Sequence, residues 1–165
     1  MIRHRLTRRA FALGILAALP ACGFAPVYGP NGTGSALQGA VLADTPATRE
    51  DFLFVREIET RLGRADPGRY GLSYAISAVS SAVAISKANV TTRYNILGEM
   101  TFALRDLQTQ AVVTSGKISN FTSYSASGST VATQAAERDA RERLMTIFAD
   151  QMITRLMVSV PAPAR

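Results

Sequence analysis

The chain has few of the residues on which most enzymes and metal proteins depend. Its 165 residues include one cysteine, Cys22, one histidine, His4, and no tryptophan. A single cysteine cannot form a disulfide within the chain, so Cys22 is a buried apolar side chain, a reactive thiol, a metal ligand or a site of modification. The neighbouring residues distinguish these four roles.

The N-terminal apolar run is too short for a permanent membrane span. It covers residues 10–19, about half of the roughly 20 residues that a helix needs to cross a bilayer. Four arginines precede it and small residues follow it. This is the arrangement of a secretory signal, with a basic region, a short apolar region and a cleavage site. We therefore predict that residues 1–21 are a signal peptide.

The four residues Leu19-Pro20-Ala21-Cys22 resemble the lipobox of bacterial lipoproteins, which has a branched apolar residue three positions before the cysteine and a small residue directly before it. The resemblance implies that the signal is removed and that Cys22 then carries a thioether-linked diacylglycerol and an N-acyl chain. Each buried CH₂ contributes about 0.8 kcal/mol, and stable anchoring takes at least two chains. The alternative is a plain secretory signal in which Cys22 is incidental.

Removal of the signal changes the charge and the available chemistry. The net charge of +6 falls to +2, because four of the 18 basic residues lie in the signal and 14 then face 12 acidic residues. This balance argues against a nucleic-acid partner. His4 is also lost, which excludes Ser-His-Asp and Cys-His sites and the usual zinc sites. We expect no catalytic residue, no metal and no cofactor apart from the acyl chains on Cys22.

Two weaker chemical signals also have structural explanations. Glu57 and Glu59 are two positions apart in a predicted helix, so they point to different faces and cannot share a substrate. The glycines of residues 29–39 lack the Lys-Ser/Thr ending of a phosphate loop. We predict that residues 22–36 are the lipidated N-terminus and a tether, that residues 37–160 form one domain, and that residues 161–165 are a tail.

Hydrophobic periodicity predicts six elements in that domain. Period-two alternation favours strands, recurrence at three and four positions favours helices, and Thr48 is a suitable helix cap. The predicted elements are strand 37–44, helix 48–64, strands 69–86, 92–107 and 111–123, and helix 130–158. The predicted fold is therefore α+β, in the order β-α-β-β-β-α, with a small, mostly antiparallel or mixed four-stranded sheet and two helices packed on one face.

The alternation also separates a core face of the sheet from an outward face. The core face is expected to carry Tyr70, Leu72, Tyr74, Ile76 and Ala78, followed by the even-numbered residues from 94 to 104. The outward face is expected to carry small polar residues, namely Ser73, Ser77, Ser115, Ser119 and Thr122. Such a surface would suit burial in the polar lumen of a β-barrel, although it is also ordinary for a solvated strand.

Two segments of the sequence resemble the LptE family of lipopolysaccharide-assembly lipoproteins. They are the start Cys22-Gly-Phe-Ala-Pro-Val-Tyr-Gly29 and the helix end Ala149-Asp-Gln-Met-Ile-Thr-Arg-Leu156, with Tyr124 before the last helix also in keeping. The resemblance implies a non-enzymatic lipoprotein at the periplasmic side of the outer membrane. Such a protein plugs the LptD β-barrel, assists its assembly, and binds lipopolysaccharide during transport to the cell surface. Gly23, rather than aspartate, after the cysteine is compatible with this location.

The resemblance also implies candidate residues for lipopolysaccharide binding. Relatives place a basic residue near the turn after the second strand, where this chain has Lys87, with Arg93 as a second candidate. A solvated turn lysine is the plain alternative. Relatives carry another basic residue at the start of the last helix, but residues 129–136 contain none, and Arg105 or Lys117 could bind an anionic lipid as readily.

Two other functions remain open on the sequence. The first is an auxiliary lipoprotein of a periplasmic transporter or secretin complex, which could share the anchor and the fold. The second is a carboxylate-based periplasmic hydrolase, which would need acidic residues that converge in one cleft.

Overall fold

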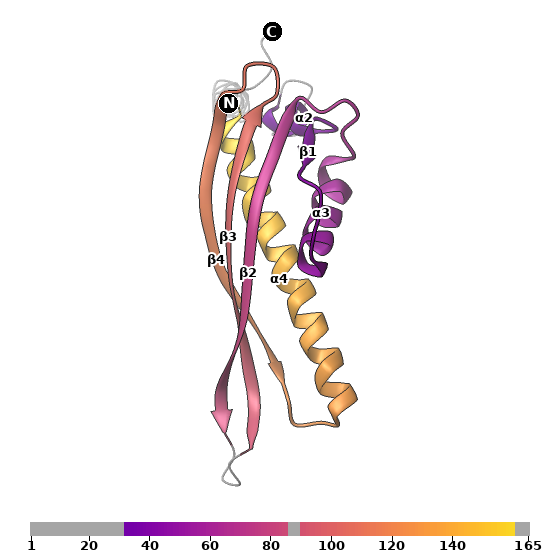
Figure 1. The fold of residues 1–165 in the computed structure, drawn as a ribbon, viewed down its shortest axis with the longest axis vertical. Coiled ribbons are helices and arrows are strands. Elements are labelled where there is room, and N and C mark those ends of the chain that lie inside the picture. The colour runs from indigo at the N-terminus through magenta and orange to yellow at the C-terminus, as the bar shows by residue number, and fades with distance from the viewer. Residues whose placement is uncertain (1–31, 86–89, 161–165) are drawn as a thin grey trace, which may run out of the picture.

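The computed structural model describes residues 32–85 and 90–160, and these confirm the predicted fold class and element order (Figure 1). Cys22, Lys87 and the predicted tail lie outside the described residues. The described elements are α2 (Thr33–Leu37), β1 (Val41–Ala43), α3 (Arg49–Leu62), β2 (Tyr70–Ile85), β3 (Thr91–Asp106), β4 (Val112–Ser125) and α4 (Thr130–Ser159).

The four strands form one sheet in the order β1-β2-β3-β4. The long strands β2, β3 and β4 form the predicted antiparallel meander. The short β1 pairs in parallel with β2, with Val41 opposite Tyr70, and α3 makes the crossover between them. Because a strand residue spans about 3.3 Å, the 16 residues of β2 extend over roughly 50 Å.

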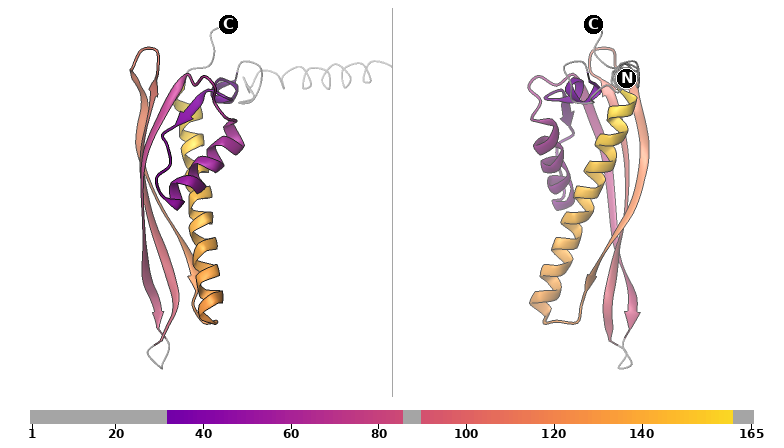
Figure 2. Two further views of the ribbon diagram at one scale, coloured as in Figure 1. Left: turned by 45° about the vertical axis from the view of Figure 1, so that its right-hand side comes forward. Right: turned by 180° about the vertical axis from the view of Figure 1, so that it is seen from behind.

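Helices α3 and α4 lie on the same face of the sheet, and no helix of the described residues lies over the opposite face (Figure 2). Thr48 caps α3 in a capping box: its hydroxyl accepts from the N–H of Asp51, and the Asp51 carboxylate accepts from the N–H of Thr48. Gly63 ends α3 at φ 78°, a backbone conformation that favours glycine. No helix within residues 32–85 and 90–160 has the length and apolar content needed to cross a membrane.

The largest difference from the prediction lies at the start of the domain. The predicted strand 37–44 shrinks to the three residues of β1, because Leu37 belongs to the short helix α2, in a segment predicted as tether up to residue 36. Leu37 is fully buried, and α2 packs beside α4. Helix α2 therefore contributes Leu37 to the core, although its first four residues fall in the predicted tether.

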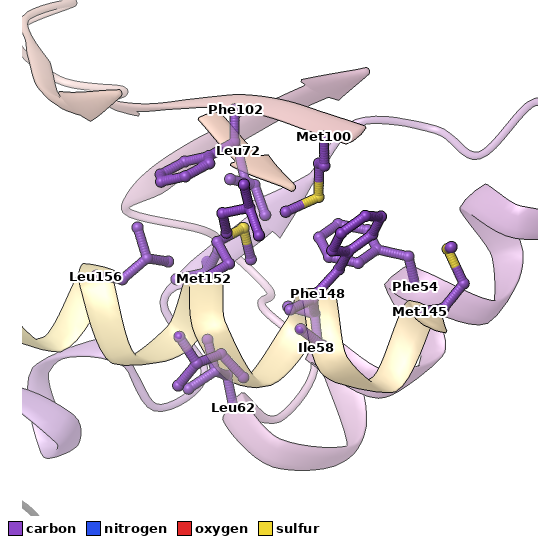
Figure 3. Packing of buried hydrophobic residues seen from close by; sticks show 14 of the residues in the cluster. Phe54, Ile58, Leu62, Leu72, Met100, Phe102, Met145, Phe148, Met152 and Leu156 are labelled. Carbon is purple, nitrogen blue, oxygen red and sulfur yellow. The ribbon is translucent and has the colours of Figure 1, made fainter. Parts of the chain in front are cut away.

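The core lies between the sheet and the two long helices (Figure 3). The helical spacing of α3 predicts Val55, Ile58 and Leu62 as its apolar face. The structure buries Phe54, Ile58 and Leu62, whereas Val55 is only partly buried. In α4 the helical spacing predicts a narrow buried face in which Ala136 and Ile147 are only partly buried in the structure; the predicted residues are Ala136, Ala140, Leu144, Ile147, Phe148, Met152 and Leu156. The buried face of α4 is wider than predicted because α4 packs against both the sheet and α3; it consists of Ala140, Leu144, Met145, Phe148, Ala149, Met152, Ile153 and Leu156.

Thr122 was expected on the outward face, and this prediction is wrong. Side chains alternate along a strand, so Thr122 cannot share a face with Ser115 and Ser119. Its side chain is buried beneath α4, and its hydroxyl donates to the Ala140 carbonyl at 2.8 Å. The hydrogen bond satisfies a hydroxyl whose burial would otherwise be unfavourable.

Candidate functional site

One face of β2, β3 and β4 is not covered by any described helix (Figure 2). The register places three side chains side by side, one from each strand, at every second position; we call each such set a rung and the surface they form the open face. Most of the side chains in these rungs are small and uncharged, and the predicted outward residues Ser77, Ser115 and Ser119 are exposed here. The rungs are Ser73/Ala103/Ser115, Ala75/Thr101/Lys117, Ser77/Glu99/Ser119, Val79/Leu97/Phe121 and Ser81/Asn95/Ser123.

One rung differs from the others because all three of its side chains are apolar. Val79, Leu97 and Phe121 are directly opposite one another and are 60%, 51% and 58% exposed. They line a hollow of about 610 Å³ together with neighbouring serines, and the Glu99–Lys117 ion pair of 2.6 Å lies beside it. We call these three residues the apolar rung.

The apolar rung cannot be recognised from the sequence alone. Each member occupies an outward position of its strand, which the alternation shows, but its neighbours are known only from the register between strands. Exposed apolar side chains that gather on one surface are typical of sites that bind a partner or a ligand. The apolar rung is therefore the feature of the open face that most needs an explanation.

Arg93 lies on the open face near the hairpin between β2 and β3. Its guanidinium donates to the Ser123 hydroxyl at 3.1 Å. No carboxylate of the described residues forms an ion pair with it, although ten ion pairs occur elsewhere in residues 32–85 and 90–160. It borders a hollow of about 550 Å³ with Ser125 and Ser127. Arg93 is thus an exposed cation beside hydroxyl groups, which is a suitable surface for an anion.

The covered face carries its own charged cluster at this end of the sheet. Arg141 of α4 contacts Glu50 at 3.0 Å and Glu137 at 2.9 Å. Burial opposes the charge of Arg141, but its hydrogen bonds to the two carboxylates hold its pKa above the ordinary value. The helical spacing predicts that Arg141 lies on the exposed side of α4, whereas its ion pair with Glu50 joins α4 to the start of α3. This cluster is structural.

Two tyrosines of the covered face have perturbed acidities. Burial, followed by the negative charges of Asp51 and Asp44, raises the pKa of Tyr74 to about 12. Burial and the neighbouring Glu137 likewise raise the pKa of Tyr124, whose ring stacks on Tyr94 at 5.3 Å. Both hydroxyls therefore remain protonated at neutral pH.

The acidic residues of α3 and α4 form ion pairs, except Asp51, which belongs to the cap of α3. Glu57 pairs with Arg61 at 3.4 Å, while Glu59 pairs with Arg64 at 3.3 Å. Glu57 and Glu59 therefore have separate partners, as expected for helix surface charges. In the part of the chain that the structure describes, no three acidic, histidine or cysteine side chains are grouped as a metal site would require.

The chain was compared with protein-family models, with curated sequences and with solved structures. The family model described as "LptE: Lipopolysaccharide-assembly" matches residues 39–156. No curated protein sequence matches the chain. Among solved structures, a lipoprotein of Caulobacter crescentus is 19% identical with a TM-score of 0.64, over 76% of this chain and 93% of that chain.

Two further structures share the fold at lower similarity. Rare lipoprotein B of Shewanella oneidensis is 14% identical with a TM-score of 0.52, over 73% of this chain and 92% of that chain. A minor lipoprotein of Acinetobacter baumannii is 12% identical with the same TM-score, over 75% and 95%. The similarity of these structures concerns the fold, whereas the family match covers more than half of the sequence. The chain therefore belongs to the LptE family of non-enzymatic lipopolysaccharide-assembly lipoproteins.

Proposed function

We propose that this protein is an outer-membrane lipoprotein that plugs an LptD-like β-barrel, assists its assembly, and binds lipopolysaccharide on its way to the cell surface. The observation that carries the proposal is the open face, a surface roughly 50 Å long composed mainly of small uncharged side chains with one apolar rung. A barrel lumen is polar, and small side chains permit close approach to its wall.

The anchor in this proposal is Cys22 with its diacylglycerol and N-acyl chain. A single acyl chain gives only reversible membrane binding, whereas two or more chains hold a protein stably. The chains would enter the inner leaflet of the outer membrane and leave the domain on the periplasmic side. Residues 22–31 would then connect the lipid to α2.

The apolar rung supplies the contact by which the open face would bind a specific barrel partner, because polar side chains alone provide little affinity. Apolar side chains at the centre of a polar surface are the usual composition of a protein interface, in which they provide most of the affinity. Val79, Leu97 and Phe121 occupy such a position, with serine-containing rungs on both sides. We therefore assign the main barrel contact to the open face.

Lipopolysaccharide carries phosphate groups, and Arg93 and Lys87 are the candidate residues that bind them. Guanidinium and ammonium groups form strong charge-assisted hydrogen bonds with phosphate. Arg93 is suited to this role because its guanidinium is exposed and has only the Ser123 hydroxyl as a described partner.

The test is affinity purification of the full chain from native membranes, followed by mass spectrometry of proteins and lipids. The expected result is recovery of a large β-barrel protein and lipopolysaccharide. Phe121→Glu on the open face should reduce barrel recovery at least tenfold. Phe52→Glu is the matched control, since Phe52 lies on α3 and is 63% exposed against 58% for Phe121.

Two results would contradict the proposal. Recovery of a secretin or an inner-membrane transporter in place of a barrel would favour the auxiliary-lipoprotein function. Equal loss of the barrel in the Phe121 and Phe52 variants would show that the open face has no special role in the contact.

A further inference from the structure

Strand β4 is an edge strand that the sequence leaves poorly protected. In the sheet order β1-β2-β3-β4, no described strand pairs with its outer edge. Long edge strands readily pair with other chains, and proteins usually prevent this with charges, prolines or bulges. The 14 residues of β4 contain no proline and one charged residue, Lys117, and the register with β3 is regular from Thr114 to Ser125.

The register shows which backbone groups point to this edge. Ala126 donates to the Thr92 carbonyl at 2.9 Å, in continuation of the β3–β4 register. Residues of an antiparallel strand alternate between bonding the neighbour and pointing away from it. Even-numbered residues of β4 therefore bond β3, and the odd-numbered residues from 115 to 125 direct their N–H and C=O groups toward the outer edge.

Side chains bind three of these outward-directed groups. Two are carbonyl oxygens that arginines of α4 reach, and the third is an N–H that a side chain of β4 itself accepts. The bonds are Arg155 to the Lys117 carbonyl at 2.8 Å, Arg143 to the Ser123 carbonyl at 3.2 Å, and the Phe121 N–H to the Asn120 side chain at 2.8 Å.

The spacing of these bonds interrupts the edge along most of its length. A strand that paired with β4 would need successive odd-numbered residues as partners, and positions 117, 121 and 123 each have one group occupied. Arg143 also forms an ion pair with Asp139. Arg155 forms no ion pair within residues 32–85 and 90–160, and the Lys117 carbonyl is its hydrogen-bond acceptor there. The Arg155 guanidinium is therefore held at the β4 edge by the Lys117 carbonyl, and not by an ion pair with a described carboxylate.

We propose that Arg143, Arg155 and Asn120 close the β4 edge against pairing with the β4 edge of a second copy of this chain. Two identical edges are self-complementary when they meet antiparallel about a two-fold axis. Four of the six odd-numbered residues from 115 to 125 are serine, and Lys117 is the one charged residue among them, so the side chains oppose such pairing only weakly. This inference is independent of the barrel and of lipopolysaccharide.

The test compares the full chain with an Arg143→Ala/Arg155→Ala variant in detergent. Light scattering should give one chain for the wild type and at least two chains per particle for the variant at the same concentration. Hydrogen exchange should show at least tenfold slower exchange of the Ser119 and Ser123 amides in the variant, because these N–H groups would become bonded to the second copy.

Three control variants separate edge pairing from other effects. Arg105→Ala/Arg138→Ala removes the same charge, but neither side chain bonds a β4 carbonyl among the described residues, so this variant should remain a single chain. Asp139→Ala breaks the ion pair and leaves the carbonyl bond of Arg143 available. Ser119→Pro, added to the first variant, removes an edge donor and should restore the single chain.

The outcomes decide the proposal. Association with slowed edge amides, reversed by the proline, supports it. A first variant that stays a single chain overturns it, as does a wild type that is already associated through these amides. Association without slower exchange at Ser119 and Ser123 also overturns it, since the contact would then lie elsewhere. The single variants Arg143→Ala and Arg155→Ala give the same readouts with smaller changes in exchange.

Discussion

Gly98 is the position at which the structure predicts a large effect from one added methyl group. It faces α4 from the centre of β3, and a Cβ built on it would lie 2.6 Å from a Leu144 methyl carbon and 2.8 Å from the Phe148 ring. Ordinary carbon contacts are about 3.5–4.0 Å. Both neighbours are fully buried, so any shift that makes room for the new Cβ must be accommodated within a closely packed core.

We expect Gly98→Ala to lower the free energy of unfolding by about 1–2 kcal/mol. Overpacking costs about 1–3 kcal/mol, and the lower flexibility of alanine offsets about 0.5–1 kcal/mol of this. Urea unfolding followed by circular dichroism measures the change. Gly128→Ala is the control, because its nearest contact would be the Ala132 Cβ at 3.3 Å, and it should alter stability by less than about 0.5 kcal/mol.

A double-mutant cycle tests the proposed cause. Leu144→Ala alone should destabilise the protein by roughly 2–5 kcal/mol. In the double variant the shortened side chain leaves room for the new Cβ, so the combined loss should be at least about 0.5 kcal/mol smaller than the sum of the single losses. A Gly98→Ala variant as stable as the wild type, or strictly additive effects, would refute the packing argument.

Three further predictions concern single side chains. The raised pKa of Tyr74 means that its contribution to stability is intact below about pH 10 and is lost as pH rises from there through about 12; Tyr74→Phe should therefore show a weaker loss of stability in urea unfolding across this range. Thr122→Val removes the bond to the Ala140 carbonyl and should lower stability by about 1 kcal/mol, whereas an unchanged midpoint would contradict a net contribution from this bond. Arg93→Gln should weaken binding of purified lipopolysaccharide at least threefold in a direct titration. Arg105→Gln, at the other end of β3, should not weaken it. Equal effects of the two substitutions would show that binding depends on the net positive charge and not on Arg93.

The sequence predicted the long elements well because their signals are local. Period-two alternation located β2, β3 and β4 to within two residues at each end. The capping residue Thr48 likewise marked the start of α3. Each of these signals depends on residues that are close in the chain, so no knowledge of tertiary contacts was needed.

The features that the sequence missed depend on contacts between distant residues. Helix α2 has five residues, too few for a helical period, and its Gly and Ser content is that of a linker. The apolar rung exists because three strands align Val79, Leu97 and Phe121, which are far apart in the chain. Candidate binding residues such as Cys22 and Lys87 came from family resemblance, and they remain predictions.

The two faces of β3 have different requirements, and this difference makes the proposed function testable. Gly98 points into the core, where an added methyl group has no space. Its neighbour Leu97 points the other way and is half exposed, so substitution there should change stability by less than about 0.5 kcal/mol. Open-face substitutions such as Phe121→Glu can therefore impair partner binding in a protein of normal stability, whereas Gly98→Ala should lower stability without altering the open face. A binding defect that accompanied both variants equally would result from lost stability and would give no support to the open face as the contact surface.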